Sequence, residues 1–159
     1  MRRCRCAEWR RRARSVCHNR LVPLVLATSH LSDDEFLDAF HSCRLRTSEF
    51  RHADHLRLAW LHLAREPFDA ALDRVRGGIQ AFAKHYHLSG LYHETITTAW
   101  MHLLAAHDES TFDEFLSVNE SQLSSNLLHR FWTPEILASR EARAHWVPPD
   151  RRELPAHTR

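Results

Sequence analysis

Two short stretches place ionisable side chains inside otherwise apolar sequence. The first is HADHLRLAWLH at positions 52–62, in which His52 and His55 stand three residues apart. On a helix this spacing puts both imidazoles on one face, where they could bind the same metal ion. His62 lies two turns further on, about 10 Å along the axis, which is too far for that ion. Asp54 points elsewhere, and we expect it to orient a ring nitrogen or to pair with Arg57.

The second stretch, YHETITTAW at positions 92–100, begins a predicted buried helix with His93 and Glu94. Charged groups rarely lie beside an apolar core unless they are paired, ligated or functional. The stretch is not the zinc-protease pattern HExxH, because Thr97 stands where the second His is required. Adjacent residues lie about 100° apart on a helix, so Glu94 is better placed as a general acid/base than as a metal ligand.

Three interpretations of these side chains remain open. In the first, His52, His55 and His93 bind one divalent metal ion (zinc, iron or manganese), whose open position activates water or polarises a substrate oxygen. In the second, the same histidines and the neighbouring Asp, Arg and Glu satisfy one another as a buried network that fixes helix register. The third is a metal-free acid–base pocket.

The elements that would position these residues are helices. A capping box, Ser32-Asp33-Asp34-Glu35, predicts a helix over 33–44. The next helix, about 49–65, is apolar nearly all round and should be central. Pro67 suits the first turn of a third helix, with an apolar stripe from Phe68 to Tyr86. Gly77-Gly78 interrupts this stripe, which predicts a bend or a close helix contact.

Further helices follow along the rest of the chain. We predict them at 92–107, from Thr111 past Phe115, at 119–131, and from Pro134 with a break near Ser139. No alternating strand pattern of useful length occurs. The sequence therefore predicts one all-α domain of five to seven helices over 31–147, followed by an extended tail at 148–159.

An arginine-rich head precedes this domain. Residues 1–20 contain eight Arg and a single acid, Glu8, and we expect residues 1–30 to be disordered and outside the fold. A misplaced start codon, a targeting segment, a basic arm or a zinc knuckle of three Cys and His18 would each explain the head. Nucleic acid is not an expected partner, because no stacking aromatics or recognition helix accompany the arginines.

The overall composition narrows the class of protein. A content of 43% hydrophobic and 26% charged residues is that of an ordinary globular domain. No apolar run approaches the ~20 residues of a membrane-spanning helix, so no membrane contact is expected. The four cysteines contain no CxxC pair, which indicates a reducing, cytoplasmic setting. A small-molecule ligand and a homo-oligomer are both compatible with the sequence.

Three motifs resemble those of a group of small bacterial helical proteins without an established activity. They are FRHADHLRLAWLHL at 50–63, YHETITTAW at 92–100, and WVPPD at 146–150 followed by LP at 154–155. The resemblance spans residues 32–155, and it departs from the group's pattern at Pro149. It implies no chemistry, only that several residues match the shared pattern: His52, Asp54, His55, Arg57, Tyr92, His93 and Thr95.

The leading functional hypothesis is a metal-dependent enzyme that acts on a small molecule, with its pocket between the helices at 49–65 and 92–107. Glu94 would be the general acid/base, with Asp54 and Arg57 as supporting or substrate contacts. The alternative is a non-catalytic helical module that binds a small molecule or a protein, in which the polar cluster is structural. An open cavity near His55 and His93 would favour the enzyme, and a closed core the module.

Overall fold

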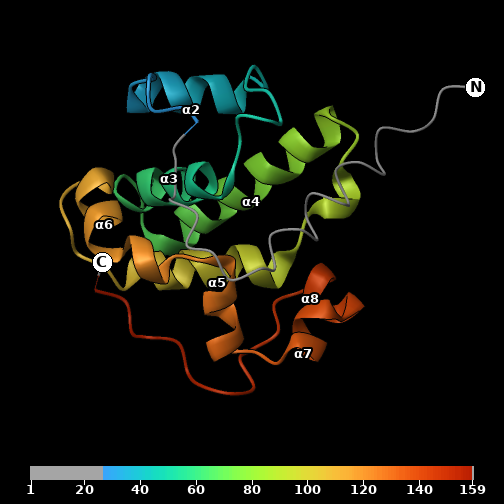
Figure 1. Cartoon of the computed structure of the whole chain (residues 1–159). Helices are drawn as coiled ribbons and strands as arrows, with labels where there is room; N and C mark the ends of the chain where they lie inside the picture. The colour runs from blue at the N-terminus through green and yellow to red at the C-terminus, as the bar shows by residue number, and fades with distance from the viewer. Residues whose placement is uncertain (1–26, 159) are drawn as a thin grey trace, which may run out of the picture.

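The computed structural model describes residues 27–158, and this part of the chain is all-α (Figure 1). Its α-helices are α2 (Asp33–His41), α3 (His52–Leu63), α4 (Phe68–His85), α5 (Glu94–Ala105), α6 (Phe112–Asn119), α7 (Pro134–Ala138) and α8 (Arg140–Ala144). Three 3-10 segments complete the elements: η1 (Ser89–Leu91), η2 (Glu120–Gln122) and η3 (Ser125–Arg130). The predicted disordered head covers residues 1–30, of which residues 1–26 lie outside the described residues. Residues 27–30 form a turn in which Thr28 is buried, so the prediction was wrong for this part.

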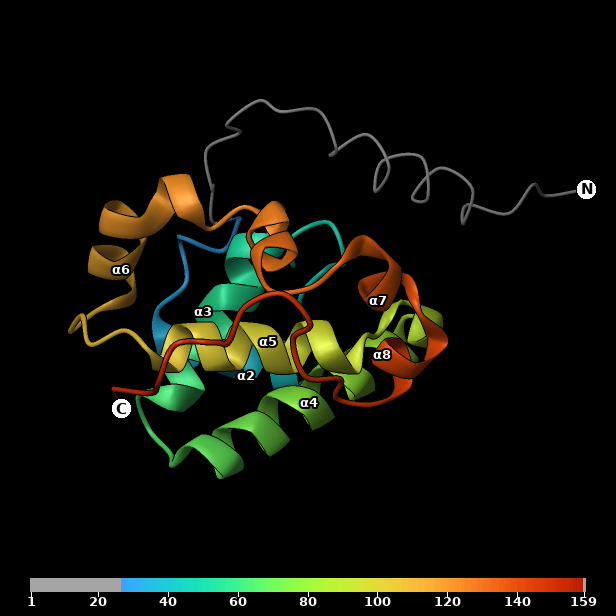
Figure 2. The ribbon, with the colours of Figure 1, turned by 90° about the horizontal axis from the view of Figure 1, so that it is seen from below.

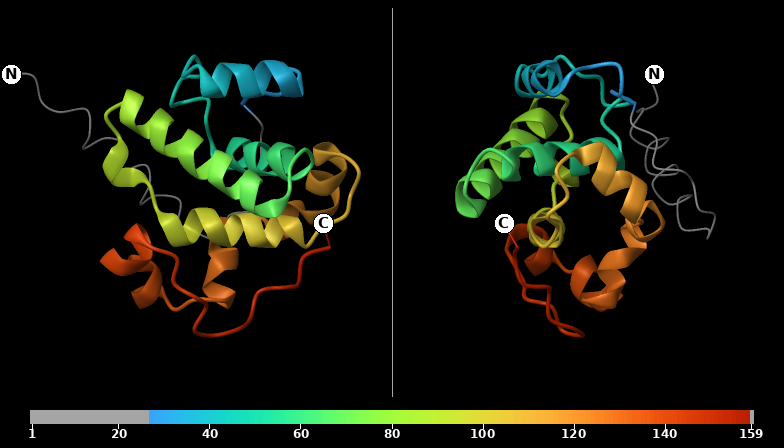
Figure 3. Two further views of the ribbon diagram at one scale, coloured as in Figure 1. Left: turned by 180° about the vertical axis from the view of Figure 1, so that it is seen from behind. Right: turned by 90° about the vertical axis from the view of Figure 1, so that its left-hand side faces the viewer.

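Helix α3 lies at the centre of this arrangement. It packs against α4, α5 and α6, while α2 contacts α4 and α8 contacts α5. Seen from behind, α2 lies on one side of α3 and α4, whereas α7 and α8 lie on the far side of α5 (Figure 3). Ten of the twelve residues of α3 are buried, which confirms the prediction that this helix is central.

Local signals set the start and end of α2. The Ser32 hydroxyl accepts from the backbone N–H of Glu35 at 3.4 Å, and the Glu35 carboxylate accepts from the N–H of Ser32 at 2.9 Å. The predicted capping box is therefore confirmed. The helix ends at His41, short of the predicted residue 44, because Cys43 adopts a left-handed φ of 55° that α-helix cannot continue through.

The double glycine in α4 marks a close helix contact at one of its two positions. A Cβ added at Gly78 would lie 2.8 Å from Cε1 of Phe40, whose ring is buried on α2. A Cβ added at Gly77 would meet no atom within 4 Å. The absence of a side chain at Gly78 therefore lets α2 approach α4. Of the predicted bend or close helix contact, the structure shows the close contact.

The region 119–131 differs from its prediction. It forms η2 and η3 instead of one α-helix, with Leu123 between them. Leu123 and Leu128 are both buried, but residues five apart lie about 140° apart around an α-helix. Two short 3-10 segments allow both side chains to reach the core. The break predicted near Ser139 is confirmed, since Ser139 is extended and separates α7 from α8.

The C-terminal tail is extended and is fastened to the helices. It runs beside α5 (Figure 2), where the N–H of Thr158 donates to the carbonyl of Ala105 at 2.9 Å. Asp150 accepts from the N–H of Thr133 at 2.8 Å, and Leu154 packs against the core. Within residues 27–158, no helix is both long and apolar enough to cross a membrane.

The two glycines of α4 provide a matched pair of variants. We expect Gly78→Ala to lower the free energy of unfolding by about 1–3 kcal/mol, because its methyl group would overlap the Phe40 ring. Gly77→Ala should instead raise it by about 0.5–1 kcal/mol, because alanine is the better helix former and the space is open. Urea unfolding followed by circular dichroism measures both, and equal effects would contradict the close contact.

Candidate functional site

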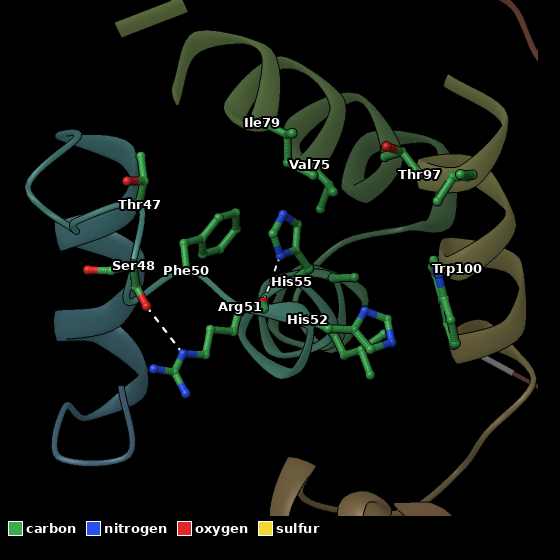
Figure 4. Close-up of a pocket in the computed structure, with 13 residues that line it drawn as sticks. Thr47, Ser48, Phe50, Arg51, His52, His55, Val75, Ile79, Thr97 and Trp100 are labelled. Atoms are coloured by element: carbon green, nitrogen blue, oxygen red, sulfur yellow. Dashed lines mark hydrogen bonds between the residues drawn. The ribbon is translucent and has the colours of Figure 1, made fainter. Parts of the chain in front are cut away.

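An open cavity of about 710 Å³ lies between α3, α4, α5 and the segment that leads into α3 (Figure 4). Its wall is mainly apolar, with a few hydroxyl and imidazole groups. The lining residues are Thr47, Ser48, Phe50, Arg51, His52, His55, Leu56, Ala59, Val75, Ile79, Ile96, Thr97 and Trp100. Cavities of about 300–1,000 Å³ with this mixture are typical of small-molecule sites.

His55 projects from the first turn of α3 into this cavity. Its Nδ1 lies 2.7 Å from the backbone carbonyl oxygen of Arg51, and because that oxygen can only accept, Nδ1 carries the proton. The other ring nitrogen, Nε2, points toward the space between Phe50 and α4 (Figure 4). Burial lowers the pKa of His55 to about 4, so the ring is neutral at pH 7.

His52 borders the same cavity on the side of α5. Its Nε2 donates to the carbonyl oxygen of Leu123 at 2.9 Å, and its ring meets Trp100 edge-on with centroids 4.9 Å apart. Burial lowers the pKa of His52, so this ring is also neutral at pH 7. Its position is therefore set by one backbone carbonyl and one aromatic face.

His93 does not join the other two histidines. It is the N-cap of α5, where Nδ1 accepts from the N–H of Ile96 at 3.2 Å and Nε2 donates to the carbonyl of Leu137 at 2.9 Å. Both ring nitrogens are thus engaged, and the lone pair that a metal would need caps the helix. Across residues 27–158, no three His, Cys, Asp or Glu side chains are grouped to hold a metal ion. The structure does not assemble the three-histidine site predicted from His52, His55 and His93.

Asp54 and Arg57 face away from the cavity, toward the segment that precedes α2. Asp54 is fully buried; one oxygen accepts from the Thr28 hydroxyl at 2.5 Å and the other from the N–H of Arg51 at 3.1 Å. Asp54 therefore caps the start of α3 and binds Thr28, which lies within the predicted head at residues 1–30.

The Arg57 guanidinium is buried beside the same segment. It donates to Asp33 at 2.7 Å and 3.1 Å, to the carbonyl of Leu31 at 2.9 Å and to the carbonyl of Thr28 at 3.0 Å. It also lies 4.7 Å from the centroid of the Phe36 ring. Because nearly every donor has a protein acceptor, Arg57 is a structural residue rather than a substrate contact.

Glu94 also lies outside the cavity wall. One oxygen accepts from Arg76 at 2.6 Å and from the Thr98 hydroxyl at 3.2 Å, and the other accepts from the Tyr92 hydroxyl at 2.6 Å. Burial and the Glu94 carboxylate raise the pKa of Tyr92, which keeps that hydroxyl protonated. The predicted general acid/base is thus a paired group that joins α4 to α5.

Of the six residues singled out from the sequence, His52 and His55 lie on the cavity, and Asp54, Arg57, His93 and Glu94 do not. The polar residues do form networks, but with backbone groups and distant side chains rather than with one another. The rest of the wall, notably Phe50, was not predicted. It stands in the first shared motif, although its apolar character gave no sign of a site.

Comparison with family models, curated proteins and solved structures found no match to this chain. The resemblance to the small bacterial helical proteins therefore stays a prediction.

Removal of the Arg57 charge should be far more damaging than removal of a surface charge. We expect Arg57→Met to lower the free energy of unfolding by about 3–5 kcal/mol, because buried acceptors lose their donors. Arg65→Met, which breaks an exposed pair with Asp34, should cost less than about 1 kcal/mol. Urea unfolding gives both values, and a small loss for Arg57→Met would contradict the structural role.

The neutral state of His55 gives a pH prediction. Its pKa is about 4 in the folded chain, against about 6.5 when unfolded. Between these values the unfolded chain binds more protons, so stability falls as the pH is lowered from about 6.5 to about 4. We expect His55→Phe to lose about 1–3 kcal/mol less of its free energy of unfolding than the parent between these pH values.

Two measurements check this prediction. Urea unfolding of the parent and of His55→Phe at several pH values gives the slope, and NMR titration of the imidazole gives the midpoint directly. A His55 midpoint near pH 6.5, or identical slopes in the two proteins, would contradict it.

Proposed function

We propose that this chain binds a small, mainly apolar molecule that carries a hydroxyl or N–H group, in the cavity between α3, α4, α5 and residues 47–51. The size of the cavity and its apolar wall support this proposal. The aromatic rings of Phe50 and Trp100 on opposite sides suit a flat, unsaturated ligand (Figure 4).

The observation that carries the proposal is the orientation of His55. The bond from Nδ1 to the carbonyl of Arg51 fixes the tautomer, which leaves a lone pair on Nε2. No donor from residues 27–158 reaches this nitrogen, whereas the Phe50 ring lies against the imidazole with centroids 3.9 Å apart and the ring planes tilted by 34°. A ligand that donates a hydrogen bond to Nε2 would satisfy the lone pair in a largely apolar setting, where an unmade bond is costly.

The chemistry of His55 favours binding over proton transfer. A general base works best when its pKa lies near the operating pH, and a pKa of about 4 makes His55 a poor base at pH 7. Glu94, the group expected to supply acid–base catalysis, is already paired with Arg76 on another face of α5. The cavity is open near His55, as the enzyme hypothesis expected, but His93 does not line it. Because neither His55 nor Glu94 is suited to proton transfer, we favour the binding module over the metal-dependent enzyme.

A pair of naphthalenes tests the hydrogen bond. We expect isothermal titration calorimetry to show that 2-naphthol binds the full chain about tenfold more tightly than 2-methoxynaphthalene, because only the naphthol can donate to Nε2. His55→Phe replaces the imidazole with an aromatic ring that has no nitrogen acceptor, so this variant should bind the two compounds equally.

His129→Phe is the matched control, because His129 is exposed on η3 and does not line the cavity. It should retain the tenfold preference. Equal binding of both compounds by the parent, binding of neither compound, or an unchanged preference in His55→Phe would each overturn the proposal.

A further inference from the structure

Two histidines outside the cavity face each other across the ends of α2 and α3. Nε2 of His41, the last residue of α2, lies 3.2 Å from Nε2 of His62 in the last turn of α3. Their ring centroids are 5.3 Å apart, with the ring planes at 73°. His62 is buried and His41 is exposed, so the pair is open to solvent on one side.

The surroundings of His62 fix its tautomer. Its Nδ1 lies 3.2 Å from Oε1 of Glu66, and the second oxygen of Glu66 accepts from Nε of Arg74 at 3.0 Å. The carboxylate can only accept, so Nδ1 of His62 carries the proton and Nε2 has the lone pair. This arrangement, a carboxylate behind an imidazole whose Nε2 carries the lone pair, is the usual outer shell of a histidine metal ligand.

We propose that His41 and His62 form a two-histidine site for a divalent transition metal ion such as Zn²⁺ or Ni²⁺. Two Zn–N bonds of about 2.0–2.1 Å at the tetrahedral angle place their nitrogens about 3.3 Å apart, and the two Nε2 atoms lie 3.2 Å apart. No third protein ligand from residues 27–158 joins them, so water completes the coordination on the exposed side of His41.

Metal binding at this site changes the tautomer of His41 but releases no proton. Without metal, His41 donates its Nε2 proton to the Nε2 lone pair of His62. With metal, His41 takes the tautomer with its proton on Nδ1, where water accepts it, and both Nε2 lone pairs bind the ion. Two arginines lie near the site and oppose a bound cation. Arg74 shares Glu66 with His62, and Arg65 pairs with Asp34. The bound ion would link α2 to α3 and so stabilise the folded chain.

A second histidine pair provides a matched comparison. Nδ1 of His102 lies 2.7 Å from Nε2 of His157 on the exposed tail side of α5. This separation is shorter than the spacing that two tetrahedral metal bonds set. Within residues 27–158, none of the hydrogen bonds or salt bridges of this pair involves a carboxylate. It therefore serves as a control for metal binding by neighbouring histidines in general.

The experiment titrates the full chain with ZnCl₂ and, separately, NiCl₂, by isothermal titration calorimetry and thermal unfolding. We expect His41→Gln to bind one equivalent fewer than the parent and to lose part of the metal-induced rise in Tm. His102→Gln should match the parent. Glu66→Gln should weaken the His41/His62 site about 10–100-fold, because the outer-shell carboxylate is lost.

The ¹⁵N shifts of the imidazoles separate this site from every other histidine or cysteine of the chain. We expect saturating Zn²⁺ to shift the Nε2 resonances of both His41 and His62 to values of metal-bound nitrogen. His41 is exposed at a helix end, so His41→Gln should fold as the parent does. Unchanged Nε2 shifts, or equal stoichiometry in the parent and His41→Gln, would overturn the proposal.

Discussion

The burial of two opposite charges on α3 is the constraint on which the rest of the structure depends. Asp54 and Arg57 lie among apolar side chains, where an unmatched charge would cost several kcal/mol. Besides the backbone N–H of Arg51, their partners are Thr28, Leu31 and Asp33, which lie in the segment that leads into α2 and at its first residue. Satisfying these charges therefore places that segment against α3. The central helix, against which α4, α5 and α6 pack, is fixed by the same bonds.

A comparable set of bonds fastens the C-terminal part of the chain to α5. The Thr95 hydroxyl donates to the carbonyl of His145 at 2.7 Å and accepts from the N–H of Val147 at 3.0 Å, and His93 holds the carbonyl of Leu137. The polar side chains of the two stretches at 52–62 and 92–100 thus mainly bind backbone groups that are distant in the sequence. Helices α3 and α5 pack against each other, and the cavity lies beside this contact, between α3, α4, α5 and residues 47–51.

The two imidazoles that line the cavity are neutral. Both His52 and His55 donate one proton to a backbone carbonyl, and burial keeps each ring uncharged. A metal site or an acid–base site would need a free lone pair on several converging groups or a pKa close to neutrality. Here each ring instead presents one fixed face to a mainly apolar space, which is the property of a binding cavity.

The sequence by itself determined the all-α class and most of the helices, because caps and apolar periodicity act within a few residues. It did not predict that residues 119–131 form 3-10 segments instead of one α-helix. The capping box at Ser32, the central position of α3 and the break at Ser139 could be predicted in this way. Spacing also placed His52 and His55 correctly on one face. The tertiary structure alone decided what the polar side chains bind. Their partners are backbone carbonyls far along the chain, 71 residues away for His52 and 44 for His93, and a carbonyl has no signature in the sequence.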